Sequence, residues 1–420
     1  MNNITFSTIG ALIGLLISII LIIKNFHATY SLIIGALIGG LIGGGSLLTT
    51  VSAMVEGAES MMSSVLRIMT SGILAGCLVK TGAAEKIADT IIKKFGEKKA
   101  IVAIAISTMI ICAVGVFIDI SIITCAPIAL SVGKKSKLSK SSILLAMIGG
   151  GKAGNVISPN PNTIATAEAF KLNITSLMYV NIIPAICALL VTIFLALKIS
   201  KKKNDIINSN DLETIKKNNL PSFFSSIVGP VTVILLLALR PIAKISIDPL
   251  IALPIGGFVC LIATKETKNT KEYVNFGFSK IINVCALLIG TGTIAGIIKN
   301  STLQQNLINL INTFNFPEFL IAPIAGILMA AATASTTAGS TIASQTFSKS
   351  LIDANISALN AGAMIHSAAT VLDSLPHGSF FHATGGSVKM SIQDRLKLIP
   401  YEAIIGLTTT IISIIIYLIS

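Results

Sequence analysis

The chain has 420 residues, of which 53% are hydrophobic and only 12% are charged, and its mean hydropathy is +0.86. Soluble domains carry roughly 25% charged residues, so this composition excludes a soluble enzyme and a nucleic-acid-binding protein, and its long apolar runs exclude a β-barrel. The formal net charge of +13 needs no acidic partner, because the basic residues stand in short runs between apolar segments, as the positive-inside rule predicts for membrane proteins.

The apolar segments predict an all-α polytopic membrane protein with about 10–12 transmembrane segments. A helix needs roughly 20 apolar residues to cross a bilayer core. Nine or more windows of about 16 to 30 residues carry no charge, among them residues 4–23, 28–55, 176–197, 281–298 and 319–348. Because Met1, Asn2 and Asn3 lack the basic stretch of a signal peptide, we expect the first helix to be retained.

A hydrophilic stretch near the middle divides the chain into two halves. We predict a first membrane repeat at residues 1–203, a cytoplasmic linker at 204–219, and a second membrane repeat at 220–420. At an offset of 217 to 220 residues the halves match weakly but in constant order; residues 75–76 correspond to 295–296, and residues 171–174 to 389–392. Such ordered self-similarity indicates an internal repeat.

The placement of charge predicts that the two repeats are inverted in the membrane. Residues 83–99 are rich in Lys, whereas the corresponding residues 302–316 carry no charge. If basic loops face the cytoplasm, 24 of the 31 Lys and Arg lie inside. We therefore expect a multi-pass protein of the inner (plasma) membrane with its N-terminus outside, an architecture typical of secondary transporters. The segments assigned to the inside are Lys24 and residues 80–99, 134–140, 198–217, 265–280 and 389–397.

Two places in each half interrupt the helical pattern while the sequence stays too apolar for a loop. In the first half these are residues 115–127 and 149–162, and in the second half residues 334–341 and 373–379. Non-helical backbone at membrane depth is tolerated only when it is buried in protein or lines a cavity. The N-terminus of a half-helix also favours an anion. The four interruptions therefore predict broken helices or re-entrant hairpins around a substrate site.

Three charged residues in these regions are candidates for function. Asp119 is the only charge in residues 100–133, and Asp373 precedes an interruption, so both are candidate proton-coupling residues. A neutral, hydrogen-bonded packing role for Asp119 and a helix-terminal role for Asp373 stay open. Lys152, among glycines, is a candidate ligand of a substrate carboxylate; the alternatives are an ion pair with Asp119 or Asp373, or a side chain that reaches the membrane interface.

Neutral and imidazole side chains complete the predicted substrate site. Amides and hydroxyls suit a hydroxylated substrate, although such groups inside membranes often bond their own helix backbone. A histidine there suits proton transfer, because its pKa is near neutrality. The remaining predicted substrate-binding residues are Asn155, Asn160, Asn162, Thr163, Ser335, Thr336, Thr337 and His377.

The sequence predicts no metal site and no organic cofactor. The six cysteines lie in or beside apolar stretches without metal-ligand spacing. No Gly-x-x-x-x-Gly-Lys-Ser/Thr string is present, so ATP-driven transport would need a partner chain. We expect the coupling ion to be H⁺, with Na⁺ as a further possibility.

Local strings across nearly the whole chain resemble the gluconate permease (GntP) family of proton symporters, within the ion transporter superfamily. The family's GGAxxIA and KFG strings resemble GAAEKIA at residues 82–88 and KFG at 94–96. Its FYEV string resembles FIDI at 117–120, and its PHPGPTAIAT string resembles PNPNTIAT at 159–166. The LDTLPH of hydroxybutyrate-type members resembles LDSLPH at 372–377.

The resemblance implies scaffold helices, a mobile transport unit with broken helices and hairpins, and a homodimer in membrane lipid. The function it implies is proton-coupled uptake of a small hydroxylated monocarboxylate, similar to gluconate or 3-hydroxybutyrate, by alternating access. A cation/proton antiporter of the same superfamily is the alternative, with Asp119 and Asp373 as ion ligands. Neither reading makes the chain an enzyme.

Overall fold

The chain folds into helices that cover most of its length. The computed structural model describes residues 6–24, 26–200, 205, 207, 208, 211, 220–243, 245, 247–303, 306, 317–376 and 378–420. Most of the predicted linker at 204–219 lies outside the described residues, and so does most of the 302–316 stretch. Within the described residues the non-helical pairing is one isolated bridge between Phe6 and Ser301.

The first half contains α1 to α11. Their bounds are α1 Thr8–Ile23, α2 Ala28–Ile42, α3 Leu47–Glu59, α4 Met62–Lys80, α5 Ala83–Phe95, α6 Ala100–Ala113, α7 Ile118–Lys135, α8 Lys140–Asn155, α9 Pro161–Ala169, α10 Ile174–Val180 and α11 Ile182–Ser200.

The second half contains α12 to α21. Their bounds are α12 Phe223–Ala243, α13 Pro249–Ala263, α14 Thr270–Lys299, α16 Ile321–Thr333, α17 Thr336–Asp353, α18 Ala358–Ala368, α19 Ser379–Ser387, α20 Ile392–Leu396 and α21 Ile399–Ile419.

Several described helices have the length and composition of membrane spans. Four stretches, Met62–Lys80, Ile182–Ser200, Thr267–Lys299 and Ile392–Ile419, are long and apolar enough to cross a bilayer, and shorter apolar helices such as α1, α2 and α6 accompany them. The predicted all-helical membrane class is thereby confirmed.

Each half repeats the same series of interruptions. A pair of helices meets at a short tip, α6–α7 at residues 114–117 and α16–α17 at residues 334–335. A second helix is broken, α8–α9 at residues 156–160 and α18–α19 at residues 369–378. At the tips, Gly115 and Ala334 adopt positive φ angles of 105° and 45°, which lets the chain reverse without a long loop.

Three of the four predicted interruptions were too wide. Residues 149–155 form the end of α8 and are helical, because Gly149 and Gly150 serve close packing: a Cβ there would lie 2.1 Å from Thr192 Oγ1 and from Ala105 O. Pro127 lies inside α7 rather than in a break. Residues 336–341, likewise predicted as irregular, form the first turns of α17.

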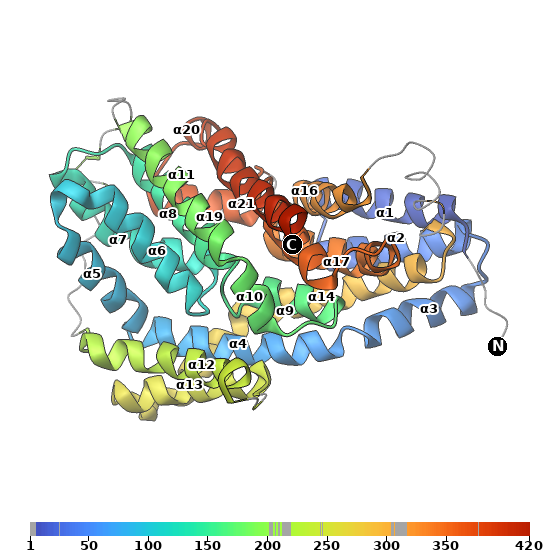
Figure 1. Cartoon of the computed structure of the whole chain (residues 1–420), viewed down its shortest axis with the longest axis horizontal. Coiled ribbons are helices and arrows are strands. Elements are labelled where there is room, and N and C mark those ends of the chain that lie inside the picture. The colour runs from blue at the N-terminus through green and yellow to red at the C-terminus, as the bar shows by residue number, and fades with distance from the viewer. Residues whose placement is uncertain are drawn as a thin grey trace.

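Helices α3 and α4 pack along α14, with which they run antiparallel. An ideal Cβ on Gly76 would lie 2.3 Å from Tyr273 O, one on Gly277 would lie 1.9 Å from Gly72 O, and Gly57 packs in the same way on Gly292. As the residue number rises along α3 and α4, its partner number on α14 falls. Small residues permit such close helix approach in membrane proteins. Figure 1 shows α3, α4 and α14 as long rods that run along the molecule, with α12 and α13 beside α4.

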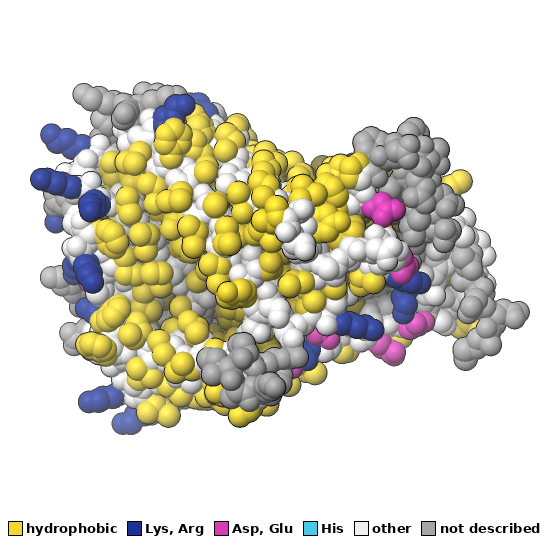
Figure 2. Space-filling view, viewed as in Figure 1, with side chains coloured by type: hydrophobic (Ala, Val, Ile, Leu, Met, Phe, Trp, Pro, Cys, Tyr) yellow, Lys and Arg dark blue, Asp and Glu magenta, His cyan; other side chains and the backbone are white. Residues whose placement is uncertain are grey.

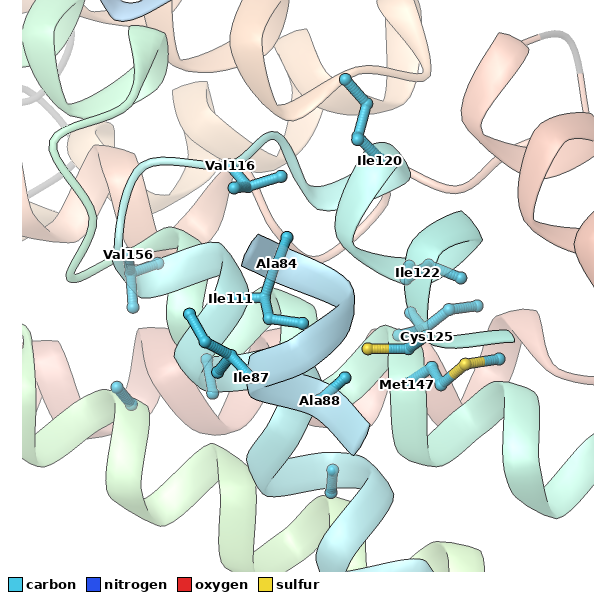
Figure 3. Packing of buried hydrophobic residues seen from close by; sticks show 14 of the residues in the cluster. Ala84, Ile87, Ala88, Ile111, Val116, Ile120, Ile122, Cys125, Met147 and Val156 are labelled. Carbon is cyan, nitrogen blue, oxygen red and sulfur yellow. The ribbon is translucent and has the colours of Figure 1, made fainter. Parts of the chain in front are cut away.

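The larger hydrophobic core includes α5, α6, α7 and α8 and extends to α4, α11 and α14. Helix α5 buries Ala84, Ile87 and Ala88 at helical spacing while its Lys side chains point outward. Figure 3 shows these residues packed against Ile111 of α6, with Cys125 of α7 close by. The apolar face of α5 thus closes one end of the α6–α7 pair.

The surface separates charge from apolar side chains. Figure 2 shows hydrophobic side chains over the middle of the visible face, most of the visible Lys and Arg at its left end, and the visible acidic side chains toward the right beside a few further basic side chains. Basic segments far apart in sequence also meet, since the Lys140 ammonium, which pairs with Asp211 at 2.7 Å, donates to the Lys389 carbonyl at 3.2 Å. Lys280 differs from the prediction: it lies within α14 rather than in a basic loop.

The glycine contact between α4 and α14 generates a stability prediction. Gly277→Ala should destabilise the protein by about 1–3 kcal/mol, because the new methyl group meets backbone rather than a movable side chain. Thermal unfolding in detergent measures the effect. Gly386→Ala in α19 is the control, since a Cβ there has nothing within 4 Å. Equal melting temperatures for both variants would contradict the close approach.

Candidate functional site

A cavity of about 410 Å³ lies where the two tips and the two helix breaks meet. Each interruption contributes residues to its wall, and helices α2 and α14 contribute the rest. The lining residues used below are Asp119 at the α6–α7 tip; Asn155, Asn160 and Asn162 at the α8–α9 break; Ser335, Thr336 and Thr337 at the α16–α17 tip; Asp373 and Ser379 at the α18–α19 break; and Lys280 and Asn283 on α14.

Three asparagines hold the α8–α9 break together. Asn160 caps α9 by accepting from the backbone N–H groups of Asn162 and Thr163 at 3.0 and 3.1 Å. Its amide donates to Asn155 Oδ1 at 2.5 Å, and the Asn162 amide donates to the same oxygen at 3.0 Å. Thr337 in turn donates to Asn162 Oδ1, which links the first break to the α16–α17 tip.

One donor in this network has no partner among the described residues. Asn155 is 2% exposed, lines the cavity, and its Nδ2 makes no hydrogen bond within the described part of the chain. A buried amide donor without a partner costs about 1–3 kcal/mol. A bound hydroxyl or carboxylate oxygen would supply the acceptor.

Lys152 is buried behind the cavity wall and paired with Asp373. Its ammonium is 2.7 Å from Asp373 Oδ1, and the two side chains are 0% and 3% exposed. The ammonium also donates to the Thr370 carbonyl and, at 3.5 Å, to the Glu402 carbonyl. A lysine has three N–H donors, so all three are used within the protein. The pairing with Asp373 is one of the alternatives that the sequence left open; Lys152 itself does not line the cavity.

Both oxygens of the Asp373 carboxylate accept hydrogen bonds as well. Oδ1 accepts from Ser374 at 2.9 Å in addition to Lys152, and Oδ2 accepts from Thr336 at 2.7 Å. Lys152 stands in the last turn of α8, Thr336 begins α17, and Asp373 lies before α19. One ion pair therefore joins three of the four interruptions.

A second buried pair supports the first. Arg395 of α20 and Glu402 of α21 are each 1% exposed and form a salt bridge, and the Arg395 guanidinium stacks on Phe381, 4.9 Å from its ring centroid. The backbone carbonyl of Glu402 accepts from Lys152 at 3.5 Å, which connects the two pairs.

Asp119 is placed differently from Asp373. It lies in the first turn of α7, is half-buried, and lines the cavity. No basic side chain in the described part of the chain lies within ion-pair distance of it. Its carboxylate lies at the cavity wall, where it interacts electrostatically with Lys280.

Four helices begin at the cavity wall. The lining includes the first residues of α7, α9, α17 and α19. Each helix N-terminus carries roughly half a positive charge and N–H groups without intrahelical partners. Side chains of Asn160 and Ser335 cap α9 and α17, whereas α7 and α19 have no side-chain cap. The cavity is therefore electropositive through its backbone.

The structure brings most of the predicted site residues together. Thr163 is buried beneath the wall, where its hydroxyl donates to Asn160 at 3.2 Å, and His377 lies outside the described residues. No group of three or more metal-ligating side chains occurs within the described residues. The predicted residues that line the cavity are Asp119, Asn155, Asn160, Asn162, Ser335, Thr336, Thr337 and Asp373.

The contribution of α14 to the cavity was not predicted from the sequence. Lys280 and Asn283 line the cavity, but Lys280 had been grouped with the basic loop before the helix. The sequence does contain a pattern that indicates helix here. The buried residues Tyr273, Gly277 and Ile281 are spaced four apart, which is the spacing of one helix face, so the helix begins before Lys280.

These features define a multi-pass membrane transporter rather than an enzyme. Residues 6–419 match the family described as GntP family permease, and the chain belongs to this family. The resemblance read from the sequence is thereby confirmed.

Known proteins similar to the chain are transporters. A Haemophilus influenzae protein described as an uncharacterized transporter is 50% identical over 413 residues, 98% of each chain. The high-affinity gluconate transporter of Escherichia coli K12 is 22% identical over 90% of each chain, and a D-serine transporter of the same strain is 22% identical over 69% of this chain and 70% of its own. The solved YdaH transporter of Alcanivorax borkumensis has a similar fold, with a TM-score of 0.70 and 11% identity over 87% of this chain and 88% of its own.

The buried ion pair generates a second prediction. Lys152→Met should destabilise the protein by about 3–5 kcal/mol, because it leaves the Asp373 carboxylate buried without a counter-charge. Lys152→Met combined with Asp373→Asn should recover most of the loss, measured by thermal unfolding in detergent. Lys397→Met is the control, because that lysine is 74% exposed and pairs at the surface. A single variant as stable as the wild type would show that the pair is not needed.

Proposed function

We propose that the chain is a proton-coupled transporter for the uptake of a small hydroxylated monocarboxylate, similar to gluconate or 3-hydroxybutyrate, working by alternating access. The observation that carries this proposal is the meeting of four helix N-termini at one polar cavity between the two halves. Such an arrangement favours an anion.

The polar lining suits the hydroxyl groups of such a substrate. Asn155, Asn162 and Thr337 offer amide and hydroxyl groups at the wall, and the unpartnered amide of Asn155 is a ready donor. A buried donor that gains a substrate partner discriminates against analogues without that oxygen. The gluconate transporter among the relatives supports this substrate class, and the D-serine transporter widens it to hydroxylated amino acids.

Asp119 is the proposed proton carrier. It lies at the cavity wall, whereas the oxygens of Asp373 already accept from Lys152, Thr336 and Ser374. The same engagement of Asp373 weighs against the antiporter alternative, in which both carboxylates would have to bind a cation. If Na⁺ were the coupling ion in place of H⁺, it would bind at the Asp119 carboxylate.

Inverted repeats are the proposed basis of alternating access. The corresponding helices α4 and α14 run antiparallel, and each half has one tip and one break in the same order. The basic end seen in Figure 2 would face the cytoplasm, with the N-terminus outside. The division into repeats at 1–203 and 220–420, the cytoplasmic linker and a homodimer in lipid belong to the same proposal.

Uptake into proteoliposomes tests the function. The purified protein should accumulate at least one acid of a panel of gluconate, 3-hydroxybutyrate, lactate, glycerate and D-serine when a pH gradient is imposed. A Na⁺ gradient alone should not drive uptake. Absence of saturable flux for every acid, with cation-driven proton movement instead, would favour the antiporter.

The proton-carrier role generates a third prediction. Asp119→Asn should reduce accumulation driven by the pH gradient at least ~10-fold while leaving substrate exchange across the membrane within about twofold, because the amide imitates the protonated acid. Counterflow of radiolabelled substrate measures the exchange. Equal loss of both activities in a folded variant would contradict the assignment.

A further inference from the structure

Lys280 is the cation that α14 presents to the cavity. It lies on an exposed position of the helix, and Asn283, Val284 and Leu287 continue the same cavity-lining face over the next two turns. Helix α14 is itself uninterrupted and anchored along its length by α3 and α4. The Lys280 side chain therefore lines the cavity from a rigid element outside the four interruptions.

The Lys280 ammonium is available for a ligand. No carboxylate of the described residues lies within 4.0 Å of it. The ammonium lies 5.2 Å from the centroid of the Phe276 ring, and it interacts electrostatically, beyond salt-bridge distance, with the Asp119 carboxylate. The Lys152 ammonium, in contrast, donates its three hydrogen bonds to Asp373 and to the carbonyls of Thr370 and Glu402. Of these two cations, Lys280 is the one that an anion in the cavity can meet.

The charges at the cavity match a single carboxylate. Asp373 and Lys152 cancel each other, which leaves Lys280 and Asp119 as the other charged side chains among the described lining residues. His27 lines the cavity too and adds a polar ring without a permanent charge. When Asp119 carries a proton, the lining has one net positive charge, and one carboxylate neutralises it.

We propose that the Lys280 ammonium binds the carboxylate of the transported anion, so that α14 supplies the charged contact and the interruptions supply the hydroxyl contacts. This proposal rests on the proposed function. It adds Lys280 as a substrate ligand and a preference for monocarboxylates over dicarboxylates. A second carboxylate on the substrate would have no cation of its own at the wall. The site therefore selects monocarboxylates against dicarboxylates of the same size.

Variants of Lys280 test the contact. For each panel acid that the wild type transports, Lys280→Gln should raise the apparent KM at least ~10-fold, and Lys280→Arg should restore part of the affinity. Lys271→Gln, at an exposed position of α14 away from the cavity, is the matched control and should leave KM within about twofold. Unchanged KM in a folded Lys280→Gln protein, or an equal rise in both glutamine variants, would overturn the proposal.

Competition between paired acids tests the selectivity. Glucarate carries a carboxylate in place of the hydroxymethyl group of gluconate, and malate carries one in place of the methyl group of 3-hydroxybutyrate. Each dicarboxylate should therefore inhibit uptake of the corresponding labelled monocarboxylate at least ~10-fold more weakly than the same monocarboxylate does when it is unlabelled. Equal inhibition would overturn the selectivity. If the wild type transports no panel acid, the proposed function itself fails; if it transports one and the Lys280 variants behave as wild type, only this inference fails.

Discussion

The Lys152–Asp373 ion pair is the interaction on which the architecture of the cavity depends. Helices that end inside the protein leave N–H and C=O groups without partners, and these are costly away from water. Lys152 at the end of α8 satisfies the Thr370 carbonyl and the Asp373 carboxylate of the α18–α19 break, and Asp373 reaches on to Thr336 at the start of α17. Three chain interruptions are thus held in one place by two opposite charges that cancel.

This cancellation shapes the site above it. Because the buried charges neutralise each other, the potential at the cavity comes from the helix N-termini, from Asp119 and from Lys280. The asparagine network around Asn155 then ties the α8–α9 break to the α16–α17 tip through Thr337. Structural charge and proposed substrate charge occupy different residues, so a substrate can leave without exposing an unpaired buried ion.

The sequence predicted the positions of the interruptions well and their extent poorly. The prolines at 159 and 161 and the polar residues around Ser335 indicate a helix break from the local sequence. Proline removes a backbone hydrogen-bond donor, and Ser and Thr side chains bond to the backbone near them. The glycines before Lys152 were ambiguous: glycine permits a break or a close helix contact, and only the positions of Ala105 and Thr192 decide for the contact.

Partners distant in the sequence could not be predicted. Lys152 and Asp373 are separated by 221 residues, and no local pattern distinguishes an ion pair from a cation that awaits a ligand. The same limit concealed Lys280, whose neighbours in sequence belong to a basic stretch while its neighbours in space belong to the cavity.

Protection of a single cysteine by substrate tests most directly that the transported anion occupies this cavity beside α14. In a chain whose six native cysteines are replaced by alanine, Asn283→Cys lines the cavity, whereas Ser279→Cys occupies an exposed position on the same helix outside it. A saturating transported acid should slow labelling of Asn283→Cys by a thiol reagent at least ~10-fold and leave Ser279→Cys unaffected. Equal labelling rates with and without the acid at both positions would contradict the account.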